Sequence, residues 1–308
     1  MAVADSSRRN VLFGLAVLAI CALVPLAYFA FLGKVTPPPP VVAPVAAPEA
    51  PKPVELKLSR LSGAVEIRRG DQAWQAAAVG DALEASDAVR TPVGGSATLT
   101  GGGSYEVQME GSTDVKVGEL TESISRLMLG SGMATARVRR GKHRFEVRAA
   151  HSDAVASTQA GTFAISSNGK GTVAVGTEAG EVELTGHGKV VIVRGGEESV
   201  VHPGQAPSAP AKIPASLLLK VRWPQRSELA TRSLWIRGSA EPGAQVVVAG
   251  HRVTVGDDGT FAAKVHLAEG KNAVEVRARA VGQRELKDAR PLTVDTTPPK
   301  AVIRPKWK

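Results

Sequence analysis

The chain has 308 residues, of which 43% are hydrophobic and 22% charged, a composition that excludes a disordered or fibrous chain. Only 4% of the residues are aromatic, whereas glycine and proline number 32 and 20, which favours many short strands joined by turns. The single cysteine, Cys21, excludes an intramolecular disulfide framework and a Cys-x-x-Cys metal site.

The formal net charge is +9, and the whole excess lies in the last third of the chain. Residues 212–308 hold 18 Lys and Arg against 9 Asp and Glu. A basic excess of this kind indicates a polyanionic partner or a membrane surface.

Residues 11–33 contain 23 consecutive residues without a charge, enough for a helix to cross a hydrocarbon core of about 30 Å. Arg8 and Arg9 precede this run, so residues 1–10 are expected to be a short cytoplasmic tail. A cleaved signal peptide is the alternative, but the run is long and ends in bulky residues. The sequence therefore predicts a single-pass inner-membrane protein whose C-terminal domains are periplasmic.

The segments after this run alternate between proline-rich linkers and strand-rich domains. Residues 34–54 are rich in proline and predict a semi-rigid linker. Short alternating runs predict an all-β domain at 55–206, although 118–129 also fits one face of a helix. A second linker is expected at 207–215, followed by a small β-sandwich at 216–297 and a basic tail at 298–308.

The first β domain resembles FecR-type periplasmic domains in the order of several motifs. The matching stretches include "GAVEIRRGDQAWQAAAVGDALEASDAVRT" at 63–91, "SRLMLGSGMATARV" at 125–138 and "GTVAVGTEAGEVEL" at 171–184. The resemblance implies an all-β solenoid or roll used for protein contact and signal transfer, and it implies a strand near Leu127. FecR regulators carry a cytoplasmic segment that controls a sigma factor, whereas about ten residues stand there in this chain.

The second β domain is similar to bacterial immunoglobulin-like modules of the glucodextranase-B kind. The similarity lies in the Gly-x-Ala-x-Pro-Gly-Ala turn, the Asp-Gly-x-Phe hairpin and the Glu-Gly-x-Asn-x-Val-x-Val run within 234–280. It implies a non-catalytic β-sandwich.

Three acidic residues, Asp81, Glu84 and Asp87, form the most conspicuous candidate for acid-base chemistry or calcium binding. The sequence places no further catalytic group or set of calcium-binding oxygens beside these carboxylates. We therefore expect them to hold turns by accepting hydrogen bonds from backbone amides. Arg90 is expected to form an ion pair with one of them. Val89 and Leu99, in the same stretch, are expected to face the core.

The candidate binding residues lie in the basic tail and are Lys300, Arg304, Lys306, Trp307 and Lys308. Basic residues with one tryptophan suit an anionic polymer or a membrane surface. The six histidines lack metal-ligand spacing, and no nucleophile elbow or phosphate-binding loop is found in the sequence, so neither a metal nor a cofactor is predicted.

Together these features predict an all-β, non-enzymatic, membrane-anchored periplasmic protein for protein contact, scaffolding or signal relay in the cell envelope. Its expected partners are other envelope proteins, with no role for nucleic acid. One alternative is a module that binds peptidoglycan or another anionic envelope polymer. The other is a sigma-factor regulator, which the short tail disfavours. The partner, the stimulus and the oligomeric state are not encoded in any recognisable motif.

Overall fold

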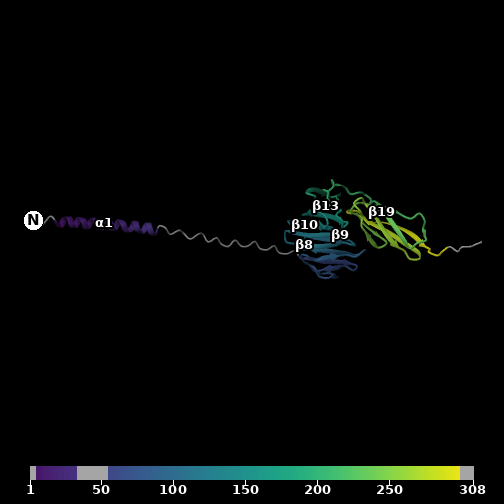
Figure 1. Cartoon of the computed structure of the whole chain (residues 1–308). Coiled ribbons are helices and arrows are strands. Elements are labelled where there is room, and N and C mark those ends of the chain that lie inside the picture. Colours follow the sequence, from purple (N-terminus) through teal and green to yellow (C-terminus); the bar gives the residue numbers. More distant parts are fainter. Residues whose placement is uncertain (1–4, 33–54, 299–308) are drawn as a thin grey trace, which may run out of the picture. The chain divides into compact units, whose positions relative to one another are not determined.

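A computed structural model describes residues 5–32 and 55–298 (Figure 1). The chain divides into two compact units, residues 1–50 and residues 51–308. The first unit contributes the helix α1, and the second contributes the strands β1 to β24.

Helix α1 (Asp5–Leu32) contains the apolar run as far as Leu32 and begins before that run. It includes six further residues at its N-terminus, and Asp5, Arg8 and Arg9 among them are charged, which is costly in hydrocarbon. Among the residues that the structure describes, none of the helices combines the length and the apolar character needed to cross a membrane. The predictions of a transmembrane helix at 11–33 and of a single-pass inner-membrane location are therefore wrong, and the fold class is corrected to a mostly β chain with one N-terminal helix.

The first β domain is built from sixteen strands that are joined in one hydrogen-bonded network. Its strands are β1 (Leu56–Ser62), β2 (Glu66–Arg68), β3 (Gln75–Ala76), β4 (Ala82–Leu83), β5 (Ala88–Arg90), β6 (Ser96–Gly101), β7 (Tyr105–Met109), β8 (Asp114–Leu120), β9 (Ile124–Val138), β10 (Arg144–Ala149), β11 (Val155–Thr158), β12 (Gly161–Ser167), β13 (Val173–Gly186), β14 (Lys189–Arg194), β15 (Glu197–Val201) and β16 (Ala211–Lys212). Strand β16 pairs with β15 and thereby extends this network into residues 207–215.

Two long strands divide the network into two layers, because each contributes its halves to different sheets. The first half of β9 pairs with β8 and β10, and its second half pairs with β7 and β12. Strand β13 does the same, with β12 and β15 at one end and β11 and β14 at the other. At the bend of β9, Gly132 has φ +110°, and a Cβ there would lie 2.4 Å from Thr113, so only glycine fits.

The core of this domain fills the space between the two layers. Strands such as β7 alternate buried and more exposed positions, as expected when one face of a sheet meets a core. Phe145, Phe163, Leu99 and Val89 are fully buried, which confirms the expectation for Val89 and Leu99. The ambiguous stretch at 118–129 lies in β8 and β9 with a turn between them, so the prediction of strand near Leu127 is confirmed.

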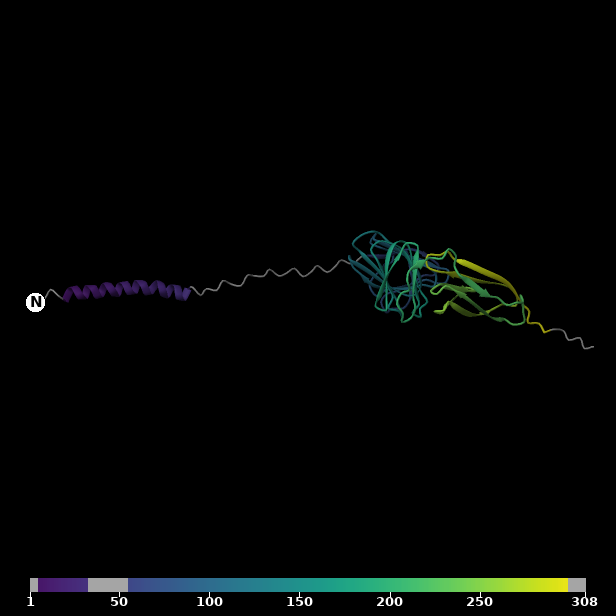
Figure 2. The same cartoon turned by 90° about the horizontal axis from the view of Figure 1, so that it is seen from above.

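Pairing in the first domain is antiparallel except between β9 and β10, so its described strands do not form a solenoid of stacked parallel coils. The sheets instead fold over one another as two layers in which all other strand pairs are antiparallel. Figure 2 shows these strands, coloured blue to teal, from a second direction.

The second β domain is a sandwich of two sheets. Its strands are β17 (Leu219–Arg222), β18 (Glu228–Leu229), β19 (Ser233–Ala240), β20 (Gln245–Val248), β21 (His251–Val253), β22 (Thr260–His266), β23 (Gly270–Arg279) and β24 (Leu286–Val294). One sheet has the order β17-β19-β22, and the other has the order β18-β24-β23-β20-β21. Ile236, Val246, Phe261 and Val276 belong to the core between them.

Candidate interaction surface at the junction of the two β domains

The acidic cluster of the sequence forms turns and does not assemble a reactive site. Asp87 is buried, its Oδ1 accepts a hydrogen bond from the amide of Gly70 at 3.0 Å, and its Oδ2 accepts one from the amide of Glu84 at 3.0 Å. Asp81 accepts one from the amide of Ala78 at 2.9 Å. These bonds occupy the carboxylates as turn-forming acceptors, as the sequence predicts.

The arginine that pairs with this cluster is not the predicted one. Arg69 Nη1 lies 2.9 Å from Asp87 Oδ2. Arg90 instead pairs with Glu66, with Nε and Oε2 2.5 Å apart, and its guanidinium lies 4.2 Å from the centre of the Trp74 ring. The prediction for Arg90 is therefore wrong, because on β5 its side chain is directed to the neighbouring strand β2, where Glu66 is its register partner.

The most elaborate polar contact in the β unit joins the two domains through Arg252 on β21. Its guanidinium donates to the carbonyl of Ser112, to Ser131 Oγ at 3.0 Å and to the carbonyl of Ser167 at 3.2 Å. These acceptors come from three separate segments of the first domain. Partial burial lowers the pKa of Arg252, and three oxygen acceptors compensate the half-buried cation in place of a carboxylate.

Further hydrogen bonds connect the same two domains around Arg252. Arg279 on β23 forms an ion pair with Glu110, with Nη1 and Oε2 2.7 Å apart. Asn168 donates to the carbonyl of Val255 at 3.1 Å, and Ser166 donates to that of Gly243 at 2.7 Å. We call this set of contacts between the two domains the junction.

An apolar patch lies within the junction. Met133, Ala164 and Ala174, from β9, β12 and β13, are buried together with Val281 of the second domain. Small residues permit this close approach, since a Cβ on Gly243 would lie 2.8 Å from the Cβ of Ala174. Buried polar groups bond only in one arrangement, so the combination of these contacts fixes the orientation of the two domains.

Two carboxylates face each other across the junction. Glu198 lies on β15, and Glu241 follows β19; both border the same small cavity. Burial, and secondarily the charge of Glu241, raises the pKa of Glu198 to about 7. Glu241 is held in place by Gln283, whose Nε2 lies 2.8 Å from Glu241 Oε2.

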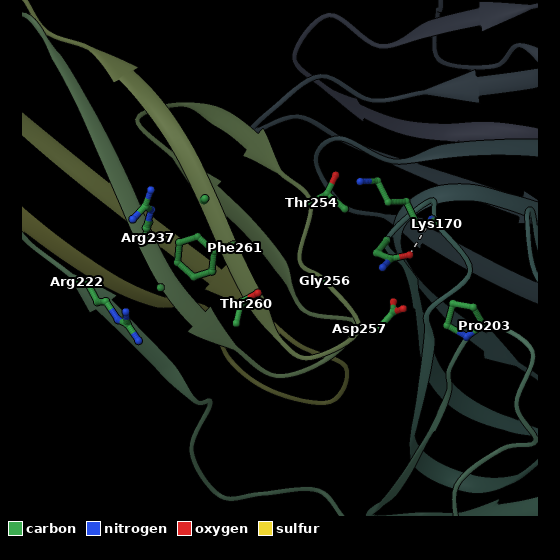
Figure 3. A pocket seen from close by; sticks show the side chains of 12 residues that line it. Lys170, Pro203, Arg222, Arg237, Thr254, Gly256, Asp257, Thr260 and Phe261 are labelled. Carbon is green, nitrogen blue, oxygen red and sulfur yellow. Dashed lines mark hydrogen bonds between the residues drawn. The ribbon is translucent and has the colours of Figure 1, made fainter.

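A cleft with a volume of about 800 Å³ opens beside the junction (Figure 3). Lys170 and Pro203 line it from the first domain, and Arg222, Arg237 and Phe261 from the second. Asp257 also borders the cleft, and its carboxylate accepts a hydrogen bond from Thr172. The cleft therefore carries three cations and one engaged carboxylate among these residues.

Residues 239–296 match the family model of glucodextranase domain B. The match lies in the second β domain and confirms the immunoglobulin-like module that the sequence predicts there. No curated protein matches the chain.

Two solved structures of a proposed anti-sigma factor from Parabacteroides distasonis are similar to part of the chain. They share 19% and 20% identity, cover 41% of this chain and 59% of their own, and have TM-scores of 0.37. A polysaccharide lyase structure has 8% identity and a TM-score of 0.19, with 80% of this chain and 40% of that chain covered. The chain thus spans between about two fifths and three fifths of the lengths of these neighbours. The FecR-type resemblance of the first domain stays a prediction.

A second group of polar side chains is enclosed inside the first β domain. Tyr105 Oη, Ser125 Oγ and His143 Nε2 are all buried there. Burial raises the pKa of Tyr105 to about 12, and the ring of His143 stacks on that of Tyr105 with centroids 5.6 Å apart. Because each of these residues is at most 8% exposed, the group lies beyond the reach of a substrate in solution.

The five tail residues predicted to bind polyanions lie outside the described residues. The junction and the cleft were not anticipated from the sequence. Their residues are ordinary Arg, Ser and Asn residues of strands and turns, which carry no motif. The one available signal was the basic excess that begins at residue 212.

Proposed function

We propose that the protein is a non-enzymatic contact protein of the cell envelope, in which the FecR-like and glucodextranase-B-type domains act together as one unit. The role is protein contact, scaffolding or signal relay. The observation that carries the proposal is the junction around Arg252, where a half-buried cation of one domain is held by three acceptors of the other.

We expect a partner that contacts both domains at once, because only such a partner depends on their fixed relative orientation. Domain interfaces within one chain ordinarily allow relative motion unless they are large and apolar, and the junction opposes such motion with hydrogen bonds around its apolar patch. Desolvating a guanidinium without a carboxylate partner is costly, so such a contact forms in one geometry or is lost. A fixed pair of domains presents a composite surface that neither domain has alone.

The experiment is photo-cross-linking in the native cells from one exposed position on each domain. Val79 in the first domain is 65% exposed and Leu286 in the second is 40% exposed. A photoreactive residue at either position is expected to capture the same protein. Introducing Arg252→Ala should reduce both cross-links, whereas Arg148→Ala, which removes an exposed cation, should leave them unchanged.

Capture of different proteins from the two positions, or cross-links that Arg252→Ala leaves intact, would contradict the proposal. Capture of a sigma factor would favour the regulator alternative instead. Turnover of the captured partner by the purified protein would contradict the non-enzymatic assignment.

A further inference from the structure

The outer face of the sheet β17-β19-β22 carries a group of cations around an exposed tryptophan. In β17, Lys220 and Arg222 are exposed, while Leu219 and Val221 are directed toward the core. On the next strands the exposed positions include Trp235, Arg237 and Lys264. We call Lys220, Arg222, Trp235, Arg237 and Lys264 the basic face.

The strand register places these five side chains together. Arg222 is directly opposite Arg237, and Trp235 is directly opposite Lys264. Directly opposed residues of antiparallel strands direct their side chains to the same side, as do residues two apart along a strand. Neighbouring strands lie about 4.8 Å apart, so the cationic groups can reach a single bound chain.

The charges of the basic face are not balanced within the sheet. The strands β17, β19 and β22 contain no Asp or Glu, and none of the four cations forms an ion pair within the described part of the chain. Like charges placed directly opposite one another destabilise a sheet, and Arg222 and Arg237 are such a pair. A bound anion would remove this repulsion.

Trp235 distinguishes this face from a merely solvated one. It is 55% exposed, although tryptophan usually buries its large ring. Its ring stands among cations on a sheet surface, with Arg237 two residues along the strand. An aromatic ring in such a position stacks against flat ligands, and the C–H face of a pyranose ring is one such surface.

The positive surface continues from this sheet into the cleft. Arg222 and Arg237 also line the cleft, and Lys170 of the first domain lies across from them (Figure 3). The acidic residue there, Asp257, is engaged by Thr172. A polymer that leaves the basic face therefore meets a further cation at the cleft.

We propose that the basic face binds an acidic polysaccharide, with a sugar ring stacked on Trp235 and the carboxylate or phosphate groups of the polymer bound by Arg222, Arg237 and Lys264. Arginine binds either anion through two parallel hydrogen bonds. Repeated negative charge satisfies the several cations, and the sugar rings supply the surface that the tryptophan fits. The inference adds a ligand class to the proposed function and does not depend on a protein partner.

The test is isothermal titration of the full-length chain with polygalacturonate as the carboxylated probe and a glycosylated wall teichoic acid, which carries sugar rings, as the phosphate-bearing probe. Dextran serves as the neutral glycan, and poly-glutamate as an acidic chain without sugars. Binding should occur to one or both acidic glycans and weaken several-fold between about 50 and about 200 mM salt. Dextran and poly-glutamate should bind at least about tenfold more weakly, since each lacks one of the two recognised features.

Matched variants distinguish binding at the basic face from nonspecific attraction by the net positive charge of the chain. Arg222→Ser with Arg237→Ser should weaken binding about tenfold or more, whereas Arg148→Ser with Arg284→Ser, which removes the same charge at exposed positions elsewhere, should change it less than about twofold. Trp235→Ala should also weaken it about tenfold, and Trp235→Tyr should retain most of it. Unchanged thermal unfolding shows that each variant folds.

Four results would overturn the inference. The first three are equal losses in the two double variants, unchanged binding by Trp235→Ala, and binding of poly-glutamate as tight as that of the acidic glycans. The last would identify an acidic protein surface as the partner. Absence of binding to both glycans would also overturn it, while the cross-links from Val79 and Leu286 would remain a separate test of the proposed function.

Discussion

Ser131 Oγ lies 3.0 Å from Arg252 Nη1, although the two residues are 121 positions apart and belong to different β domains. The same Nη1 reaches the carbonyl of Ser112, and Nη2 reaches that of Ser167. One side chain thus connects three segments of the first domain to β21 of the second. The two domains are therefore expected to respond together when this residue is changed.

Replacing Arg252 by alanine should destabilise the unit, because two carbonyls and one hydroxyl of the first domain lose the hydrogen bonds that this side chain donates. We expect the free energy of unfolding to fall by about 2–3 kcal/mol. Urea unfolding followed by tryptophan fluorescence should change from one transition to two, since the domains lose their coupling. Arg148→Ala, at an exposed position, should stay within about 0.5 kcal/mol of the original chain. A single unshifted transition for Arg252→Ala would show that the contact carries no coupling.

Gly243 and Gly250 have the same φ, so substitutions at these two positions distinguish the effect of backbone strain from the effect of packing at the junction. Gly243 and Gly250 both have φ +80°, but a Cβ on Gly243 would lie 2.8 Å from Ala174 whereas one on Gly250 would meet nothing within 4 Å. Gly250→Ala should lose about 1 kcal/mol of unfolding free energy through backbone strain alone. Gly243→Ala should lose about 1–3 kcal/mol more, because it overpacks the junction. Equal losses in thermal unfolding would mean that the domains do not pack closely at Ala174.

Glu198 makes the stability of the β unit depend on pH. Its pKa is raised from the ordinary value to about 7, so the folded chain keeps a proton that the unfolded chain releases at lower pH. Stability should therefore decrease as the pH rises from about 4.5 to about 7 and stay lower above that range. Glu198→Gln, which stays neutral, should remove this decrease in denaturant titrations. A decrease of the same size in that variant would assign the pH dependence to other groups.

Asp87 and Asp81 are expected to differ in importance although both hold turns. Asp87 is buried and accepts bonds from two amides and Arg69, whereas the bond that Asp81 forms with the amide of Ala78 is exposed. Asp87→Ala should lower the free energy of unfolding by about 2–3 kcal/mol, and Asp81→Ala by about 1 kcal/mol or less. Chemical denaturation measures both. Similar small losses would contradict the role of Asp87 as the organising acceptor of these turns.

Local patterns were sufficient for much of the β architecture. Alternation of apolar and polar residues predicted the strands on both sides of residue 207, and the turn role of Asp81 and Asp87 followed from the chemistry of aspartate in turns. The glucodextranase-B-type domain was recognisable because its turn residues stand at fixed offsets from one another. These features depend on near neighbours in the chain, which a sequence displays directly.

Features that depend on distant residues were not predictable in the same way. The partner of Arg90 is Glu66, 24 residues away, because strand pairing and not sequence proximity selects it. Arg252 could not be distinguished from other arginines, since its acceptors are backbone carbonyls and a serine in another domain. The membrane prediction placed Arg8 and Arg9 in a tail before the apolar run, whereas the structure includes both residues, with Asp5, in the same helix.

A distance measurement between the two β domains shows whether the junction holds them as one unit. Spin labels at Val79 and Leu286, one in each domain, report the distribution of inter-domain distances by double electron-electron resonance. We expect one narrow distribution for the original chain and a broad one for Arg252→Ala. A distribution that is already broad in the original chain, and unchanged by the substitution, would contradict this expectation.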